Sequence, residues 1–108
     1  MGDGVGAVFA ALADPSRRYL VERLAHLGSS TPTELASELP MTRQAVAKHL
    51  AALEHAGLVR ARREGRQTVY RPDPAPLRDA TAWMDRVGGE WDARLEALAR
   101  HAAGREPA

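Results

Sequence analysis

The chain of 108 residues is long enough for one small domain with a hydrophobic core, and its 44% hydrophobic and 27% charged residues exclude a disordered chain. Because the sequence contains no cysteine, it excludes disulfide bonds, thiolate metal sites and thiol redox chemistry. Its apolar runs are too short to cross a bilayer, and its first residues lack the pattern of a secretory signal. We therefore expect a cytoplasmic protein that does not contact membranes.

The N-terminal third of the chain predicts two helices. The apolar segment 5–13 is the first, and the second begins at Pro15 with Asp14 as its N-cap. Proline is favoured in the first helical turn, and an aspartate there accepts hydrogen bonds from free backbone amides. Apolar side chains then recur at helical spacing up to Gly28, where the second helix is expected to end.

Two further helices are expected in the middle of the chain. Residues 31–34 read Thr-Pro-Thr-Glu, a capping box that opens a short helix reaching Glu38. Thr42 is the expected N-cap of the next helix, which stops at Gly57. The apolar residues of that helix recur every three or four positions and predict one buried face, formed by Val46, Leu50 and Leu53.

The opposite face of this fourth helix has a composition that suits the DNA major groove. Arg43 and Gln44 lie in its first turn, where Arg pairs well with guanine and Gln with adenine. Ala47 and Ala51 are small, so the backbone can approach base edges closely. The alternative is a solvated helix face that carries two cations. The residues expected to contact DNA from this helix are Thr42, Arg43, Gln44, Ala47 and Lys48.

A short basic β-hairpin is predicted directly after this helix, with strands over 58–63 and 68–71 joined at Glu64-Gly65. Seven basic residues and only two acidic ones lie between Met41 and Arg71, although the net charge of the whole chain is +1. Arginines on an exposed ribbon often serve solubility alone. Clustered beside a capped helix, they are better explained as contacts to phosphates or to the minor groove, made by Arg62, Arg63, Arg66 and Gln67.

The hairpin also carries four apolar side chains, which we expect to pack inward only in part. They are Val59, Ala61, Val69 and Tyr70.

The last predicted element is a long helix over 77–101 with an apolar seam. Leu77, Met84, Trp91 and Leu98 are seven residues apart, the spacing of a coiled-coil seam. Packing within the chain must cover part of this stripe, but the helix is longer than one small domain can cover. Gly88-Gly89 indicates either a kink or a close helix crossing. The predicted dimer interface consists of Val8, Phe9, Leu77, Met84, Val87, Trp91, Leu95 and Leu98.

Together these segments resemble the ArsR-type winged-helix repressors. The resemblance rests on FAALADPSRR at 9–18, ELA at 34–36, VAKHLAALEHAGLV at 46–59 and the GR and VY pairs of 65–70. It implies a mainly α protein with a β-hairpin wing: one winged helix-turn-helix domain over 1–108, about five helices, and 77–101 as the dimerisation helix. It also implies a homodimeric repressor that binds an inverted repeat in double-stranded DNA. At position 47 the family often has serine instead of alanine, and we interpret the motif histidine, His49, as a packing residue.

The chain departs from the metal-sensing members of that family. Those members bind metals through thiolates or through His and carboxylate groups of the last helix. Here cysteine is absent, and the last helix has one histidine, His101, without a metal-ligand spacing. We therefore expect no metal and no cofactor. The sequence does not reveal whether a small effector binds.

An enzyme and a protein-binding winged helix are the two alternative classes. An enzyme is not expected, because the chain has no nucleophile-elbow serine, no phosphate-binding glycine loop and no metal-spaced histidines. A winged helix that binds only other proteins is the serious alternative. It would predict apolar rather than arginine-rich outer positions on the fourth helix and the hairpin.

Overall fold

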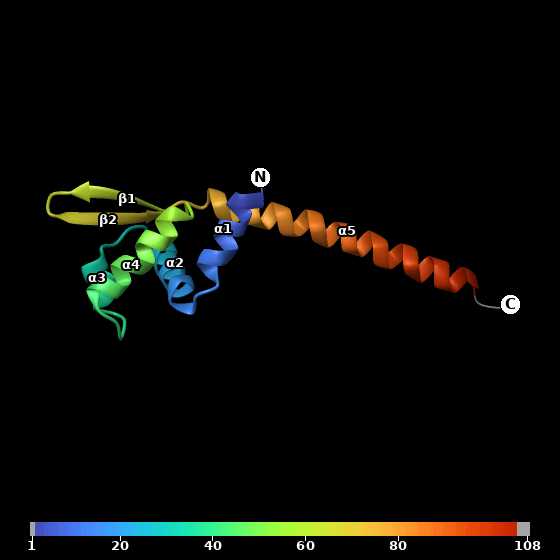
Figure 1. The fold of residues 1–108 in the computed structure, drawn as a ribbon, viewed down its shortest axis with the longest axis horizontal. Coiled ribbons are helices and arrows are strands. Elements are labelled where there is room, and N and C mark those ends of the chain that lie inside the picture. The colour runs from blue at the N-terminus through green and yellow to red at the C-terminus, as the bar shows by residue number, and fades with distance from the viewer. Residues whose placement is uncertain (1, 106–108) are drawn as a thin grey trace.

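The computed structural model describes residues 2–105, which form five helices and one antiparallel hairpin (Figure 1). The predicted fold class is therefore confirmed. In chain order, the elements are α1 (Gly2–Leu12), α2 (Pro15–Leu27), α3 (Pro32–Ala36), α4 (Arg43–His55), β1 (Val59–Glu64), β2 (Gln67–Pro72) and α5 (Ala75–Arg105). Within this described part, no helix combines the length and apolar character that a membrane crossing requires.

The helix starts follow the capping signals of the sequence. The Asp14 carboxylate accepts hydrogen bonds from the backbone amides of Ser16 and Arg17, at 2.7 and 3.2 Å. Thr31 and Glu34 form a reciprocal capping box at the start of α3, and Thr42 caps α4 by accepting from the amide of Ala45 at 3.0 Å. These caps satisfy backbone donors that have no partner inside the helix.

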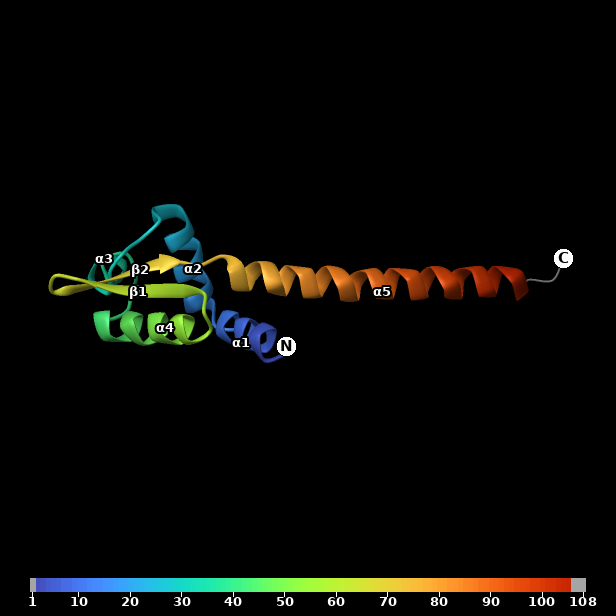
Figure 2. The same ribbon diagram turned by 90° about the horizontal axis from the view of Figure 1, so that it is seen from above.

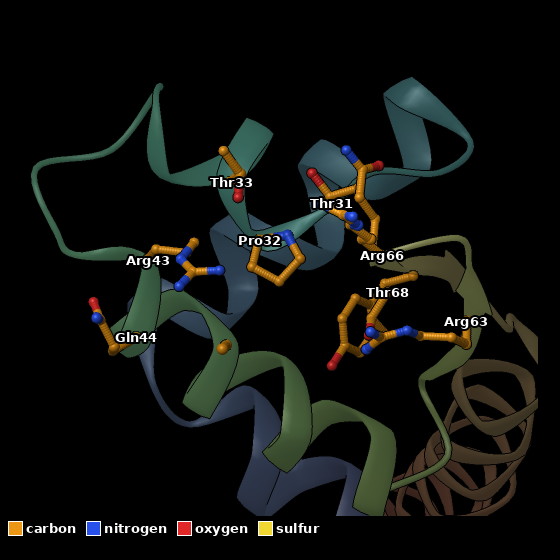
Figure 3. Close-up of a pocket in the computed structure, with 11 residues that line it drawn as sticks. Thr31, Pro32, Thr33, Arg43, Gln44, Arg63, Arg66 and Thr68 are labelled. Carbon is orange, nitrogen blue, oxygen red and sulfur yellow. The ribbon is translucent and has the colours of Figure 1, made fainter.

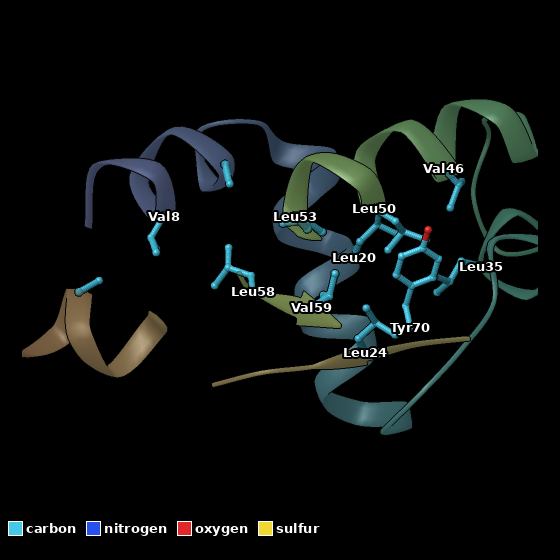
Figure 4. Packing of buried hydrophobic residues seen from close by; sticks show 12 residues of the cluster. Val8, Leu20, Leu24, Leu35, Val46, Leu50, Leu53, Leu58, Val59 and Tyr70 are labelled. Carbon is cyan, nitrogen blue, oxygen red and sulfur yellow. The ribbon is translucent and has the colours of Figure 1, made fainter. Parts of the chain in front are cut away.

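The core lies between α2, α4 and the hairpin (Figure 4). Val46, Leu50 and Leu53 are fully buried, which confirms the inward face predicted for α4. Val59 and Tyr70 are also buried, at 2% and 8% exposure, so the expectation that they pack only in part was wrong. They are covered because the hairpin's base lies against the helices and not in solvent.

The hairpin turns one residue later than the sequence predicted. Glu64 pairs with Gln67, so the turn consists of Gly65 and Arg66 and not of Glu64-Gly65. Gly65 has a φ of 63°, in the left-handed region, and no non-glycine residue of the described chain has a positive φ. This combination is typical of a two-residue turn with glycine in its first position.

Helix α5 leaves the rest of the molecule as a single rod (Figures 1 and 2). It begins earlier and ends later than the predicted 77–101, and it passes through Gly88-Gly89 without interruption. The molecule therefore measures 76 × 28 × 21 Å. Near its start, α5 packs against α1, where the rings of Phe9 and Trp83 meet edge to face at 5.7 Å.

The same packing corrects one predicted interface residue. Val8 is 1% exposed and belongs to the same buried cluster as Leu58 and Ala80 (Figure 4). A side chain that is covered by its own chain has no surface left for a second copy. Val8 is therefore a core residue and not part of a dimer interface.

A bidentate ion pair holds the segment that leads into α4. Arg23 on α2 donates to both carboxylate oxygens of Glu38, at 2.6 and 3.2 Å. The hydrogen bond from Arg23 lowers the pKa of Glu38. A carboxylate with a lowered pKa stabilises the fold at neutral pH, and this contribution is lost as the pH falls through that lowered pKa.

We therefore expect Glu38→Gln to lower the thermal midpoint more at pH 7 than at pH 3, because the contribution of the ion pair is progressively lost as the pH falls. Thermal unfolding followed by circular dichroism at both pH values measures this. Glu22→Gln, which alters an exposed carboxylate of α2, is the control. Equal losses at the two pH values would contradict the role of the ion pair.

Candidate DNA interface

An open groove of about 330 Å³ lies between the first turns of α3 and α4 and the hairpin (Figure 3). Three segments that are far apart in the sequence line it. From α3 and the residue before it come Thr31, Pro32 and Thr33; from α4 come Arg43, Gln44 and Ala47; from the hairpin come Arg63, Arg66, Gln67, Thr68 and Tyr70.

The groove is lined by most of the side chains that were predicted from the sequence to contact DNA. Those from α4 and those from the hairpin now line one hollow, in spite of the roughly twenty residues between them. Thr42, Lys48 and Arg62 are exposed but do not line it. The hydroxyl of Thr42 is engaged in capping α4.

Strand alternation decides which arginines of the hairpin face the groove. Arg63 is paired with Thr68, and both lie on the same face of the ribbon as the buried Tyr70. Arg62 is paired with Val69 and therefore lies on the opposite face. The structure thus separates Arg62 from the cluster into which the sequence placed it.

Ion pairs offset some of the positive charge of the hairpin, but on its other face. Arg60 pairs with Asp73 at 2.9 Å, and Arg71 pairs with Glu64 at 3.6 Å. Within the described chain no carboxylate lies within 4.0 Å of the guanidinium nitrogens of the groove arginines, Arg43, Arg63 and Arg66. The positive potential is consequently concentrated in the groove, where it suits a polyanion.

Sequence reasoning did not find the contribution of α3 to the groove. Thr31, Pro32 and Thr33 were recognised as a capping box but not as a wall of the site. They lie there because Ser30 and Tyr70 exchange two backbone hydrogen bonds, at 3.0 and 2.8 Å. A contact between residues forty positions apart leaves no local signal in one sequence.

The described residues contain no group of three or more His, Cys, Asp or Glu side chains arranged to hold a metal ion. His49 is half-buried on α4 and does not line the groove. The chemistry of the site is therefore that of arginines, amides, hydroxyls and small side chains. Such groups bind phosphates and base edges.

A short capped helix, a second helix with Arg and Gln in its exposed first turn, and an arginine-bearing hairpin define a winged helix-turn-helix DNA-binding protein. Comparison with known proteins agrees. The family profile described as a helix-turn-helix domain matches residues 12–62. Over 76 residues the chain is 47% identical to the HTH-type transcriptional regulator Rv2034 of Mycobacterium tuberculosis, an alignment that covers 70% of each chain. The chain belongs to the ArsR-type family of winged helix-turn-helix transcriptional regulators.

Solved structures support the same assignment. An ArsR-like transcriptional regulator from Rhodococcus sp. RHA1 superposes with a TM-score of 0.83, at 39% identity over 93% of each chain. The homodimeric winged helix-turn-helix DNA-binding domain of Mb0332 from Mycobacterium bovis superposes with a TM-score of 0.61, at 32% identity. That comparison covers 98% of this chain and 83% of the other. The protein is thus a DNA-binding transcriptional regulator.

We expect zinc, nickel and cadmium at physiological concentrations to leave the DNA affinity unchanged, because cysteine is absent and the carboxylates and the single histidine of α5 do not converge. Elemental analysis of the purified protein and gel shifts with and without each metal measure this. A stoichiometric metal together with metal-dependent release of DNA would overturn the expectation.

Proposed function

We propose that the protein represses transcription in the cytoplasm by occupying an inverted-repeat DNA site as a homodimer, without a catalytic step. The observation that carries the proposal is the groove, in which Arg43 and Gln44 of α4 and Arg63 and Arg66 of the wing line one open hollow. Two copies related by a two-fold axis would present two such grooves to two half-sites of opposite orientation.

Within each groove we assign base recognition to α4 and backbone binding to the wing. Arg43 and Gln44 are exposed in the first helical turn, beside the small Ala47, so their side chains can reach base edges in the major groove. Arg66 lies in the hairpin turn, and Arg63 lies two residues before the turn begins. From there they can reach phosphates or the minor groove, which position the protein without reading the sequence fully.

Exposed apolar side chains on α5 support the dimer. Trp91, Leu95 and Leu98 are 69%, 62% and 55% exposed, and Met84 is 47% exposed. Such a stripe is unfavourable in water and is typical of a protein–protein interface. Phe9 and Leu77 border it where α1 meets α5, and Val87 is half-buried within it. The homodimeric state of the Mb0332 domain supports a second copy as the partner.

Trp91→Ala is expected to weaken the homodimer by about 2–4 kcal/mol, the cost of removing an aromatic anchor from an interface. Sedimentation velocity over a micromolar concentration range measures the dissociation constant. Glu96→Ala, on the opposite side of α5, is the control and should leave it unchanged. Wild-type protein that sediments as a monomer at micromolar concentration would disprove the dimer.

The salt dependence of binding tests the wing's role. If each protomer neutralises about four phosphates, the slope of log affinity against log salt is about −7, and Arg66→Ala in both protomers should bring it about two units closer to zero. Affinity for specific and random duplexes should fall together. Arg100→Ala, which removes the same charge from distal α5, should change neither.

The helix substitutions should behave differently from the wing substitution. Arg43→Ala or Gln44→Ala should relax base preference at one position of each half-site, at a cost of about 1–3 kcal/mol per contact. Selection from a random duplex pool followed by sequencing measures this preference. Loss of specific binding by Arg66→Ala with random-DNA binding and slope intact would show that the two roles are wrongly assigned.

A further inference from the structure

A short segment before α3 joins that helix to the wing. The backbone of Ser30 donates to the carbonyl of Tyr70 at 3.0 Å and accepts from its amide at 2.8 Å, which adds one antiparallel bridge to β2. Ser30 and Thr31 are 4% and 5% exposed, and they are the buried polar residues of the described chain. Buried polar groups are costly unless their partners are well placed, so this segment has little freedom to move.

One carboxylate connects that segment to the first turn of α3. The Oε1 atom of Glu34 accepts from the hydroxyl of Ser30 at 3.2 Å and from the amide of Thr31 at 3.1 Å. In return, the amide of Glu34 donates to Oγ1 of Thr31 at 3.1 Å. The side chain of Glu34 therefore holds both the cap of α3 and the residue that is hydrogen-bonded to the wing.

These bonds lie behind the walls of the DNA groove. Thr31, Pro32 and Thr33 form one wall (Figure 3), and Thr68 and Tyr70 of β2 form another. Arg66 is in the turn directly before β2, so its position relative to α3 and α4 depends on how β2 is held. A change in the Ser30–Tyr70 contact would therefore alter the spacing between the wing arginines and the reading helix.

We propose that Glu34 is a positioning residue for DNA binding, which sets the wing relative to the helix-turn-helix through Ser30 and does not itself contact DNA. This inference rests on the proposed function, because it needs the groove to be the DNA site. A glutamate near phosphates is electrostatically unfavourable, so its benefit lies in its acceptor oxygen. Glutamine supplies the same acceptor without the charge.

A double-mutant cycle tests the inference. The probe is a duplex selected from a random-sequence pool by the wild-type protein. We expect Arg66→Ala alone to weaken DNA binding about tenfold. In a Glu34→Ala background the same substitution should weaken DNA binding about threefold or less, because Arg66 contributes less affinity when the wing is not fixed in position. Arg43→Ala, on the reading helix, should cost nearly the same factor in both backgrounds. Glu34→Gln should restore wild-type coupling.

Thermal unfolding identifies variants that are folded at the assay temperature. If the Glu34→Ala variant is unfolded at that temperature, Ser30→Ala takes its place in the same cycle. Ser30→Ala removes only the hydroxyl hydrogen bond to Glu34 and keeps the backbone bridge to Tyr70. An Arg66→Ala effect of the same size in both backgrounds, or equal coupling to Arg43 and Arg66, would overturn the positioning role. Absence of any Arg66→Ala effect in the wild-type background would instead refute the proposed DNA groove itself.

Discussion

Burial of one face of α4 is the constraint on which the site depends. Val46, Leu50 and Leu53 have no exposed surface, and rotating the helix to expose any of them would cost several times the thermal energy. Because successive residues of a helix are about 100° apart, fixing these three side chains also fixes where Arg43 and Gln44 project. The reading face of the helix is thus determined by the side chains that never meet DNA.

Burial also fixes the orientation of the side chains of the wing, but with the two-residue period of a β-strand. Val59 and Tyr70 are buried at the base of the hairpin, and their burial sets which residues face inward. A slip of one residue would turn Arg63 away from the groove and Arg62 into it. The turn at Gly65 and the Ser30–Tyr70 bridge oppose such a slip from the two ends of the ribbon. Two core contacts therefore determine which arginine is available in the groove.

The parts of this structure that could be predicted from the sequence are those with local causes. The caps Asp14 and Thr42 and the buried stripe of α4 follow from interactions within a few residues. Val8 and Phe9 show the limit of such reasoning, since neighbours on one apolar helix differ from 1% to 39% exposure. Tertiary packing decides between them, because Val8 lies in the buried cluster that includes Leu58 and Ala80. The wall of the groove that α3 forms was missed for the same reason, because a distant backbone pairing creates it.

Gly88 and Gly89 of α5 have no role in the packing of the single chain and therefore bear on the proposed dimer. Two glycines in a helix cost about 2 kcal/mol relative to alanine, and the helix shows no interruption that would require them. A β-carbon at Gly88 or Gly89 would meet nothing within 4 Å in the single chain, so packing within the chain does not explain them either. Gly89 faces away from the exposed stripe, but Gly88 lies beside it with Met84 and Trp91, where a second helix would cross. A close crossing there is the explanation that the proposed dimer supplies, and an unbroken α5 would then hold the two DNA grooves at a fixed separation.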